Sequence, residues 1–466
     1  MSTLPSTFVD TIARIVGPGN IRRDAASLLA YGTDALLKGH PADLVVLPAS
    51  TEEVAAVARH CHEMRVPLVP RGGGTGYTGG AVPIAGGVVL SLERLARILE
   101  IDEENLLAVV EPNVVTATLQ DAVERVGLFY PPDPASLKQS VIGGNVAECA
   151  GGPRAFKYGT TKRYVLGLEA VLPTGDVIHT GSKVVKNVVG YDLTQLLVGS
   201  EGTLAIITKI ILRLVPKPPV QITLRASFPD VNHAVNAVSE LLRRRVVPAA
   251  IELIDGECLD AVARYLNERL APPGTGALLL VEVDGIGTGV ADEADRVEEA
   301  CLAAGGGDVL RAADPEAREG LWRVRREISP SLKTIAPFKI NHDVVVPRGR
   351  IPQLFALVER LKREFNLTIP CFGHAGDGNI HVNVMVDPAD PVAIARGRDA
   401  ERALFEGVVA LEGSISGEHG IGFSKAPFIG LELSPVEIAL MKRLKLAFDP
   451  HGVLNPGKIF PPEPIL

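Results

Sequence analysis

The chain has 466 residues, of which 46% are hydrophobic and 22% are charged, a composition typical of a globular protein with two or three domains. Its formal net charge is −8, and both signs are mixed along the chain. Because no stripe of basic residues stands out, the sequence does not indicate a nucleic-acid-binding protein.

No apolar run approaches the roughly 18 residues that a transmembrane helix needs, and residues 1–17 lack the cationic start and apolar core of a signal peptide. The five cysteines form no C-x-x-C pair, which favours reduced thiols and argues against an iron–sulfur cluster within this chain. We therefore expect a soluble cytoplasmic protein; a peripheral position at the inner membrane stays open.

The first 70 residues predict helices and strands in alternation. Residues 1–40 predict helical packing segments, and the apolar stretch 43–50 predicts a buried strand. Residues 51–64 show apolar side chains at helical spacing, and 66–70 predict a short strand.

A loop with six glycines, PRGGGTGYTGG, then occupies residues 70–80. Backbone without side chains can approach a phosphate closely, so the loop predicts a cradle for a phosphate-bearing cofactor. The spacing of Gly74, Gly76 and Gly79 matches the dinucleotide fingerprint, but that fingerprint requires a helix directly afterwards, whereas 87–92 predicts a strand. A Rossmann turn is therefore not expected, and a flexible linker between strands remains the alternative.

Further along, residues 116–127 predict a second helix, and 140–161 form a second glycine-rich region. Residues 165–181 predict an antiparallel hairpin, and 199–216 predict a turn followed by a long β-branched strand. The proline-rich stretch 216–220 then indicates the end of a first domain.

The pattern changes after residue 220 to long helices between strands. Helices are predicted at 232–245, 291–305 and 351–365, and strands at 276–285 and 380–386. This alternation indicates a second α+β domain.

Six ordered motifs together resemble the FAD-linked oxidases and dehydrogenases of the vanillyl-alcohol-oxidase type fold, in the branch of D-2-hydroxy-acid dehydrogenases (D-lactate dehydrogenase-like) and glycolate-oxidase FAD subunits. The resemblance covers nearly the whole chain, and its motifs are PRGGGTGYTGG (70–80), IGGNVAECAGGPRAFKYGTT (142–161), GSEGTLAIIT (199–208), GHAGDGNIH (373–381), SGEHGIG (416–422) and FDPHGVLNPGK (448–458). It implies an α+β fold with three parts. These are a two-subdomain FAD-binding domain at 1–220, a substrate or cap domain at 221–415, and a C-terminal segment at 416–466 that packs back on the FAD domain.

The resemblance also implies the residues that bind FAD. Those expected at the pyrophosphate are Pro70, Arg71, Gly72, Gly73, Gly74, Thr75, Gly76, Thr78 and Gly79. Those expected along the ribityl chain and ring are Ser136, Ile142, Gly143, Gly144, Asn145, Ala147, Gly151, Gly152 and Tyr158. The adenosine half would contact Glu201, Gly202 and Ile207, and Asn455 would return to the flavin. Some relatives tether flavin through a histidine just after the first glycines, where this chain has Thr75, so we expect non-covalent FAD.

A metal site is predicted around His374 and His381, which bracket a glycine-rich turn between two predicted strands. A hairpin would let both imidazoles face one point, and Asn383 would project on the same side as His381. With Glu418 this gives two histidines and a carboxylate, which suits a divalent ion, Zn or Mn. Taken alone, each histidine is also compatible with an ordinary hydrogen-bonded polar residue.

The activity implied is oxidation of a D-2-hydroxy acid, such as D-lactate, glycolate or D-2-hydroxyglutarate, to the 2-keto acid. The substrate oxygens would chelate the metal, His419 would accept the hydroxyl proton as general base, and hydride would pass to flavin N5. Arg325 and Ser329, at i and i+4 of a helix-like segment, and Lys339 are assigned to substrate contact together with Asn383. The alternative to substrate contact for the charged residues is that they belong to an ordinary run of charges exposed to solvent.

Three further expectations concern partners and competing functions. Electrons would pass to a quinone, an electron-transfer flavoprotein or an iron–sulfur subunit, and a homodimer stays open. One alternative is an FAD subunit that works only within a glycolate oxidase complex with an iron–sulfur partner. A remote alternative, based on the histidines and Glu418 alone, is a metal-dependent hydrolase.

Overall fold

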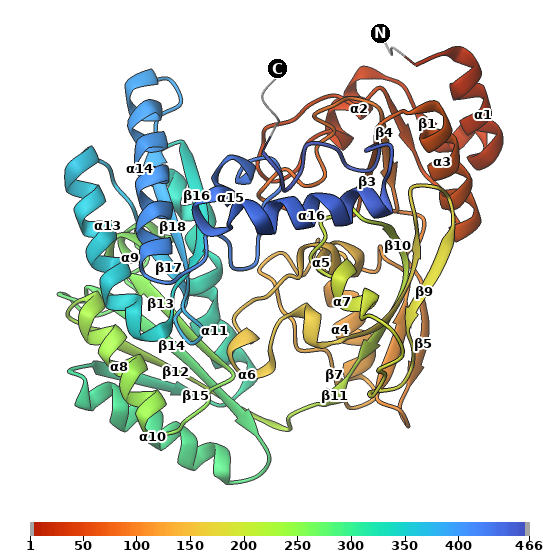
Figure 1. Cartoon of the computed structure of the whole chain (residues 1–466). Helices are drawn as coiled ribbons and strands as arrows, with labels where there is room; N and C mark the ends of the chain where they lie inside the picture. The colour runs from red at the N-terminus through yellow and green to blue at the C-terminus, as the bar shows by residue number, and fades with distance from the viewer. Residues whose placement is uncertain (1–3, 462–466) are drawn as a thin grey trace. The chain divides into compact units, whose positions relative to one another are not determined.

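The computed structural model describes residues 4–461, which fold into two units, each with its own sheets and helices (Figure 1). Unit 1 comprises residues 1–150, 160–217 and 418–466, and unit 2 comprises 151–159 and 218–417. Residues 151–159, which the sequence placed in the first domain, thus cluster with the second unit. Helices and strands occur in both units, and the predicted α+β class is confirmed.

The first sheet of unit 1 has four strands in the order β1-β2-β4-β3. Strands β2, β4 and β3 are parallel, and β1 runs antiparallel to β2. Because β3 lies at the edge of this sheet, it tolerates Pro70, which has no N–H to donate. The bounds are β1 Ile21–Arg22, β2 Leu44–Val46, β3 Leu68–Arg71 and β4 Val88–Ser91.

Three helices accompany this sheet: α1 Ser6–Val16, α2 Ala25–Tyr31 and α3 Thr51–Met64. The helix predicted at 51–64 is confirmed at those limits. The Ser50 side chain accepts a hydrogen bond from the backbone N–H of Glu53, which caps its start. Val54, Ala58 and neighbouring apolar residues of α3 are buried against the strands.

The second sheet of unit 1 is antiparallel, in the order β5-β6-β10-β8-β9. The hairpin predicted at 165–181 is confirmed as β8 and β9. The bounds in this part of the unit are β5 Ile98–Asp102, β6 Leu107–Val110, β7 Leu128–Phe129, β8 Val165–Val171, β9 Val177–Gly181, β10 Ile206–Arg213, β11 Val215–Pro216, α4 Thr116–Glu124, α5 Ile142–Glu148, α7 Leu193–Leu197, α15 Ile429–Glu432 and α16 Pro435–Phe448. The 3-10 helices of both units are Pro18–Asn20, Thr161–Arg163, Leu332–Thr334, Arg348–Arg350 and Ala426–Phe428.

Unit 2 is built on a seven-stranded antiparallel sheet in the order β15-β12-β14-β13-β17-β18-β16. Its strands are β12 Val220–Phe228, β13 Ala250–Asp255, β14 Ala277–Gly285, β15 Gly307–Ala312, β16 Phe338–Val345, β17 Cys371–His374 and β18 Asn379–Val386. Its helices are α6 Ala155–Tyr158, α8 Val231–Arg243, α9 Gly256–Leu266, α10 Gly289–Ala303, α11 Pro315–Arg326, α12 Ile328–Ser331, α13 Ile351–Phe365 and α14 Pro391–Ala410.

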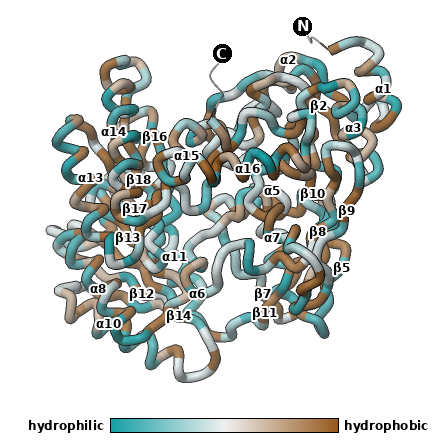
Figure 2. Tube along the Cα trace, in the orientation of Figure 1, coloured by the Kyte–Doolittle hydropathy of each residue, from teal (hydrophilic) through white to brown (hydrophobic). Residues whose placement is uncertain are grey.

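The two faces of this sheet differ in chemistry, because successive side chains of a strand point to opposite faces and directly paired residues share a face. One face is apolar, as the paired row Leu279, Leu253, Gly373, Ile380 and Val344 shows. Helices α8, α10 and α14 pack on the strands there, and hydrophobic colour runs along those strands (Figures 1 and 2). The opposite face carries the polar residues Glu282, Glu252, His374, His381, Asn383, Asn341, Asp343 and Lys339.

Within residues 4–461, none of the helices combines the length and the hydropathy that crossing a lipid bilayer requires. The five cysteines are free thiols, and all except Cys149 are buried.

Candidate active site

The predicted histidine hairpin is confirmed in unit 2. Strand β17 ends at His374, strand β18 begins at Asn379, and these two residues pair across the turn. Gly378 has φ +88°, and a Cβ there would overlap with the carbonyl oxygen of Val346, so the tight turn requires glycine. The rings of His374 and His381 lie with their centroids 5.3 Å apart at an interplanar angle of 84°. Both side chains are buried on the polar face of the sheet.

A carboxylate that the sequence analysis did not single out joins this hairpin to the predicted substrate residues. Glu252, on the neighbouring strand β13, is directly opposite His374 in the sheet. Its Oε1 lies 2.5 Å from His374 Nδ1, and its Oε2 accepts a hydrogen bond from Arg325 Nε. Burial alone would raise the pKa of Glu252, but the charges and hydrogen bonds of these two partners lower it to about 2.

Arg325 lies near the end of α11, with its guanidinium 4.6 Å from the centroid of the Phe372 ring. The predicted single helix with Arg325 and Ser329 on one face is instead two helices, α11 and α12, separated at Glu327. Pro330 has no N–H to donate to the carbonyl of Arg326, so the helical hydrogen-bond ladder is interrupted there.

Lys339 lies on strand β16, as predicted, and its Nζ donates to Ser329 Oγ at 2.7 Å. Burial lowers the pKa of Lys339 to about 8. On the same sheet face, Asn341 Nδ2 donates to Asn383 Oδ1 at 2.6 Å. The structure therefore joins Ser329 to Lys339, and it connects the amide of Asn383 to the same strand.

Asp343 fixes the chain just before Glu418. Asp343 pairs with His381 in the sheet and is fully buried. The N–H of Gly417 donates to its backbone oxygen at 3.0 Å and to its Oδ2 at 2.9 Å. Glu418 is the next residue, and consecutive Cα atoms are about 3.8 Å apart. Glu418 therefore directly follows the residue that is hydrogen-bonded to Asp343, the sheet neighbour of His381.

His419 begins a segment held within unit 1 by the first glycine-rich loop. Thr78 Oγ1 donates to the carbonyl of His419 at 3.1 Å, and the Tyr77 and His419 rings are 5.2 Å apart. The Glu201 carboxylate accepts the N–H groups of Ile421 and Gly422 at 2.7 and 2.6 Å. The predicted phosphate loop and the predicted base are thus neighbours in unit 1.

The first glycine-rich loop connects the parallel strands β3 and β4 with no helix between them, so the exclusion of a Rossmann turn is confirmed. The second glycine-rich region lies beside this loop. A Cβ at Gly72 would come within 2.6 Å of Val141, and one at Gly73 within 2.7 Å of the carbonyl of Gln139. Unit 1 therefore brings the two predicted cofactor regions together.

These residues fit a phosphate-bearing cofactor. A Cβ placed on Gly76 would meet only Asp34 Oδ2 at 3.9 Å, and one on Gly144 only Val141 at 3.7 Å, so open space adjoins both glycines. Asn455, next to Leu454 at the β3 edge, donates Nδ2 to the carbonyls of Gly80 and Glu201. Its buried Oδ1 has no hydrogen-bond partner, which leaves an acceptor for a ligand.

The other predicted FAD residues divide between the units. In unit 1, Ile142, Asn145 and Ala147 lie on α5. The carbonyl of Ala147 accepts a hydrogen bond from the N–H of Glu201, and that of Ser136 accepts one from the N–H of Ser140. Gly202 packs against Pro70, and Ile207 pairs with Ala170 in the second sheet. Gly151, Gly152 and Tyr158 belong to unit 2, where the Tyr158 hydroxyl donates to Asp284 Oδ2 at 2.7 Å.

Sequence reasoning missed Glu252, Asn341 and Asp343. Glu252 lies in the middle of the otherwise apolar strand AIELID, whose other acidic residue, Asp255, is at its end. A buried charge requires a partner, so that pattern was the available signal. Asn341 and Asp343 lie two and four residues after Lys339 on β16 and so share its face of the sheet.

Comparison with known proteins agrees with this arrangement. The family model described as "FAD binding domain" matches residues 42–181, and that described as "FAD linked oxidases, C-terminal domain" matches 217–459. The glycolate oxidase subunit GlcD of Bacillus subtilis (strain 168) is 41% identical over 453 residues, which cover 97% of this chain and 96% of the relative. The D-lactate dehydrogenase of Anaerostipes hadrus is 37% identical over 427 residues, covering 90% and 89%. The solved structure of p-cresol methylhydroxylase with substrate bound superposes with a TM-score of 0.83 at 20% identity, covering 98% and 97%.

An FAD-binding domain followed by an oxidase C-terminal domain defines an FAD-dependent oxidoreductase. The chain belongs to the family of FAD-linked oxidases, and its fold is of the predicted vanillyl-alcohol-oxidase type. The alternative of a metal-dependent hydrolase is therefore not retained.

Proposed function

We propose that this protein oxidises a D-2-hydroxy acid, of the D-lactate, glycolate or D-2-hydroxyglutarate type, to the 2-keto acid. The observation that carries the proposal is the polar face of the unit 2 sheet, where the two imidazoles share a face with Lys339 and Arg325 binds the carboxylate that contacts His374. Two cations suit a carboxylate substrate, and two imidazoles suit a divalent ion. The names of the two relatives, a glycolate oxidase subunit and a D-lactate dehydrogenase, point to the same substrate class.

Unit 1 would hold the cofactor. We assign the pyrophosphate to the loop Arg71 to Gly79 and the flavin side to the region around Gly143 and Gly144, with Asn455 offering its free Oδ1. No histidine follows the first glycines, which is consistent with non-covalent FAD. FAD, when bound, accepts the hydride that the substrate carbon loses.

His374, His381 and Glu418 would hold a divalent ion. Glu252 contacts Nδ1 of His374 and orients the ring so that Nε2 would be its ligand atom. Two imidazoles and a carboxylate suit Zn or Mn, and such an ion lowers the pKa of a substrate hydroxyl. Arg325 and Lys339 would bind the carboxylate of the substrate. Asn383 would bind a neighbouring oxygen of the substrate.

His419 would take the hydroxyl proton. Its neighbour in the chain is Glu418, one of the proposed ligands, and its ring lies 5.2 Å from that of Tyr77. The proton would be held on the imidazole while the carbon is oxidised.

Anaerobic flavin reduction tests the proposal. Purified protein should be yellow, and addition of the D form of a short 2-hydroxy acid, or of glycolate, should bleach the flavin absorbance, whereas the L form should not. A panel of acids of both hands, each with and without a chelator, identifies the substrate and the need for a metal. Protein that takes up no FAD, or FAD that no 2-hydroxy acid reduces, would contradict the proposal.

The buried lysine gives the enzyme an expected pH dependence. Because the pKa of Lys339 is about 8, its charge is lost as the pH rises through that value, so kcat/KM should fall above about pH 8 through a rise in KM. Lys339→Met should have a low kcat/KM without this fall. Its melting temperature at pH 7 should not decrease, because the wild type keeps a desolvated cation there. A wild-type profile that stays flat between pH 7 and 9.5 would remove Lys339 from substrate binding.

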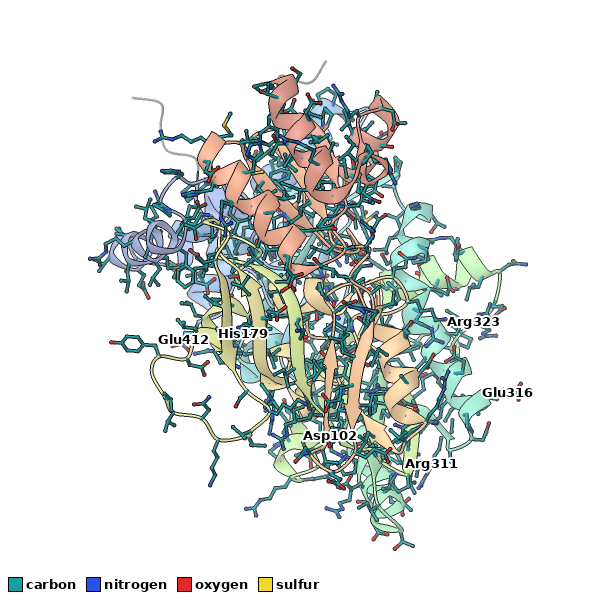
Figure 3. The ribbon with its side chains drawn as sticks, turned by 90° about the vertical axis from the view of Figure 1, so that its right-hand side faces the viewer. Asp102, His179, Arg311, Glu316, Arg323 and Glu412 are labelled. Carbon is teal, nitrogen blue, oxygen red and sulfur yellow. The ribbon has the colours of Figure 1, made fainter. Side chains whose placement is uncertain are left out.

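A second candidate, an FAD subunit that passes electrons to an iron–sulfur partner, is favoured by one surface feature. The loop 182–192 follows β9, whose His179 is labelled in Figure 3, and projects from the strands of unit 1. Its Val188, Val189 and Tyr191 are 96%, 91% and 96% exposed, which is unusual for neighbouring apolar residues and typical of protein interfaces. The B. subtilis relative is itself named a subunit.

This candidate predicts that the loop holds an iron-containing partner. The triple variant Val188→Ser, Val189→Ser, Tyr191→Ser, tagged and purified from its own cells, should retain substrate-reducible flavin but lose co-purifying iron. Ile286→Ser removes another exposed apolar side chain, 86% exposed and in unit 2, and should retain the iron. If wild-type preparations contain no iron and turn over with a quinone alone, the chain acts without such a partner.

A further inference from the structure

The carboxylate of Glu252 is buried at the centre of the site and both of its oxygens are occupied. The residue is 0% exposed. Oε1 contacts His374 Nδ1, and Oε2 accepts a hydrogen bond from Arg325 Nε. These two partners lie 122 and 73 residues further along the chain. A charge this deeply buried is tolerated only when it is fully paired, so its two partners are fixed along with it.

The contact with His374 determines which ring nitrogen faces the site. A carboxylate at Nδ1 requires the proton on that nitrogen, and this leaves the lone pair on Nε2. The same contact orients the ring, because Glu252 and His374 are directly opposite on neighbouring strands. Without the carboxylate, the imidazole could adopt the other tautomer or rotate.

The contact with Arg325 fixes the second partner. Only Nε is used by Glu252, so the terminal N–H groups of the guanidinium stay available for another anion. The Phe372 ring lies beneath the same guanidinium at 4.6 Å and is 5.0 Å from the ring of His381. Arg325 is therefore held from two sides.

We propose that Glu252 is a positioning residue that orients His374 for a divalent ion and Arg325 for the substrate carboxylate at the same time. The inference rests on the proposed function and adds to it a residue outside the proposed ligand and substrate sets. A single carboxylate would thereby set the distance between the ion and the substrate anion.

The test compares Glu252→Gln with a matched control on the other face of the sheet. Glutamine preserves the shape but replaces one carboxylate oxygen with an NH₂ donor, which would face either His374 Nδ1 or Arg325 Nε and could not accept from it. Glu401 is likewise buried and likewise paired with a histidine and an arginine, His342 at 3.0 Å and Arg398 at 2.8 Å, but it contacts none of the proposed site residues. Glu401→Gln should therefore lower the melting temperature without changing the site.

Two readouts should change together in Glu252→Gln. Affinity for Zn²⁺ or Mn²⁺, measured by competition with a chelator on the FAD-loaded protein, should fall by about 10- to 100-fold. KM for the hydroxy acid should rise as well, whereas FAD content should not change. Glu252→Asp, which keeps the charge but is shorter, should recover part of the metal affinity.

A double variant separates positioning from general stability. In a His374→Ala background, Glu252→Gln should cause no further loss of metal affinity, because its effect would act through that ring. A Glu252→Gln protein with wild-type metal affinity and KM would overturn the inference, and so would equal losses in Glu401→Gln. If the wild type itself binds no ion and no hydroxy acid reduces its flavin, the proposed function fails instead.

Discussion

Replacing His381 with alanine is expected to remove the divalent ion and to lower kcat by about 10³-fold, with FAD still bound. Polarisation of a substrate oxygen by an ion stabilises charge by several kcal/mol, and each ~1.4 kcal/mol corresponds to a factor of ten in rate. His381 projects from the centre of β18 into the polar face, 5.3 Å from the ring of His374. The proposed flavin residues of unit 1 do not include it, so the flavin spectrum should be unchanged.

The control for His381→Ala is His342→Gln. His342 is another buried histidine, on β16, but it lies on the apolar face and pairs with Glu401. This variant should melt at a lower temperature and keep its metal content. Metal analysis of the purified proteins, together with turnover before and after added Zn²⁺ or Mn²⁺, decides the outcome. His381→Ala with wild-type metal content and turnover would exclude His381 as a ligand.

The local elements of the fold could be predicted from the sequence because their signals lie within a few residues. Helix α3 has an apolar stripe, an N-cap at Ser50 and a left-handed C-cap at Arg65, and its predicted limits are those observed. The histidine hairpin was also predicted, because a turn containing Gly376 and Gly378 stands between two apolar runs. Both cases depend on neighbours in the sequence.

Glu252 could not be assigned in this way, because its role depends on pairings across the sheet. The sequence shows an acidic residue in an apolar strand, but not that β13 lies between β14 and β17. Only that strand order places Glu252 opposite His374, 122 residues further along the chain. The alternation of side chains along a strand predicts which face of the sheet a residue lies on. It does not predict which strand is the neighbour.

Residues 151–159 belong to unit 2, and this too depends on contacts between residues that are far apart in the sequence. Lys157 Nζ donates to Asp284 at 2.5 Å, and the Tyr158 hydroxyl donates to the other oxygen of that carboxylate at 2.7 Å. These bonds join residues more than 120 positions apart. Gly151, Gly152 and Tyr158 were expected along the flavin in the first domain, because the sequence contains no local sign of a distant carboxylate partner.

The segment that carries Glu418 and His419 passes from unit 2 into unit 1. Unit 2 supplies the histidines and the cations, and its Asp343 binds the N–H of Gly417. The next two residues, Glu418 and His419, begin the last segment of unit 1, where Thr78 and Glu201 bind it. The segment 416–422 therefore carries two residues of the proposed site, Glu418 and His419, so replacing either of them tests the proposal directly.

Replacing His419 with alanine should lower kcat by about 10²- to 10⁴-fold, the usual contribution of a positioned general base. Metal content and FAD content should stay at wild-type values, because the backbone contacts of this segment with Thr78 and Glu201 do not use the imidazole. Added imidazole should restore part of the lost rate, since the space left by the ring lies beside Tyr77. A loss of rate without rescue but with loss of FAD would indicate a structural role instead.

The control for His419→Ala is His451→Ala, because His451 is also a histidine of unit 1 stacked on an aromatic ring. Its ring lies 4.2 Å from that of His62, on the surface and among none of the proposed site residues. Its replacement should leave kcat and its pH profile unchanged. Single-turnover flavin reduction tests this step without the later oxidation of the flavin. If His419 accepts the hydroxyl proton, reduction in His419→Ala should be slow and should respond to added imidazole and to pH. Flavin reduction at the wild-type rate across the whole pH range would show that the hydroxyl proton leaves by another route.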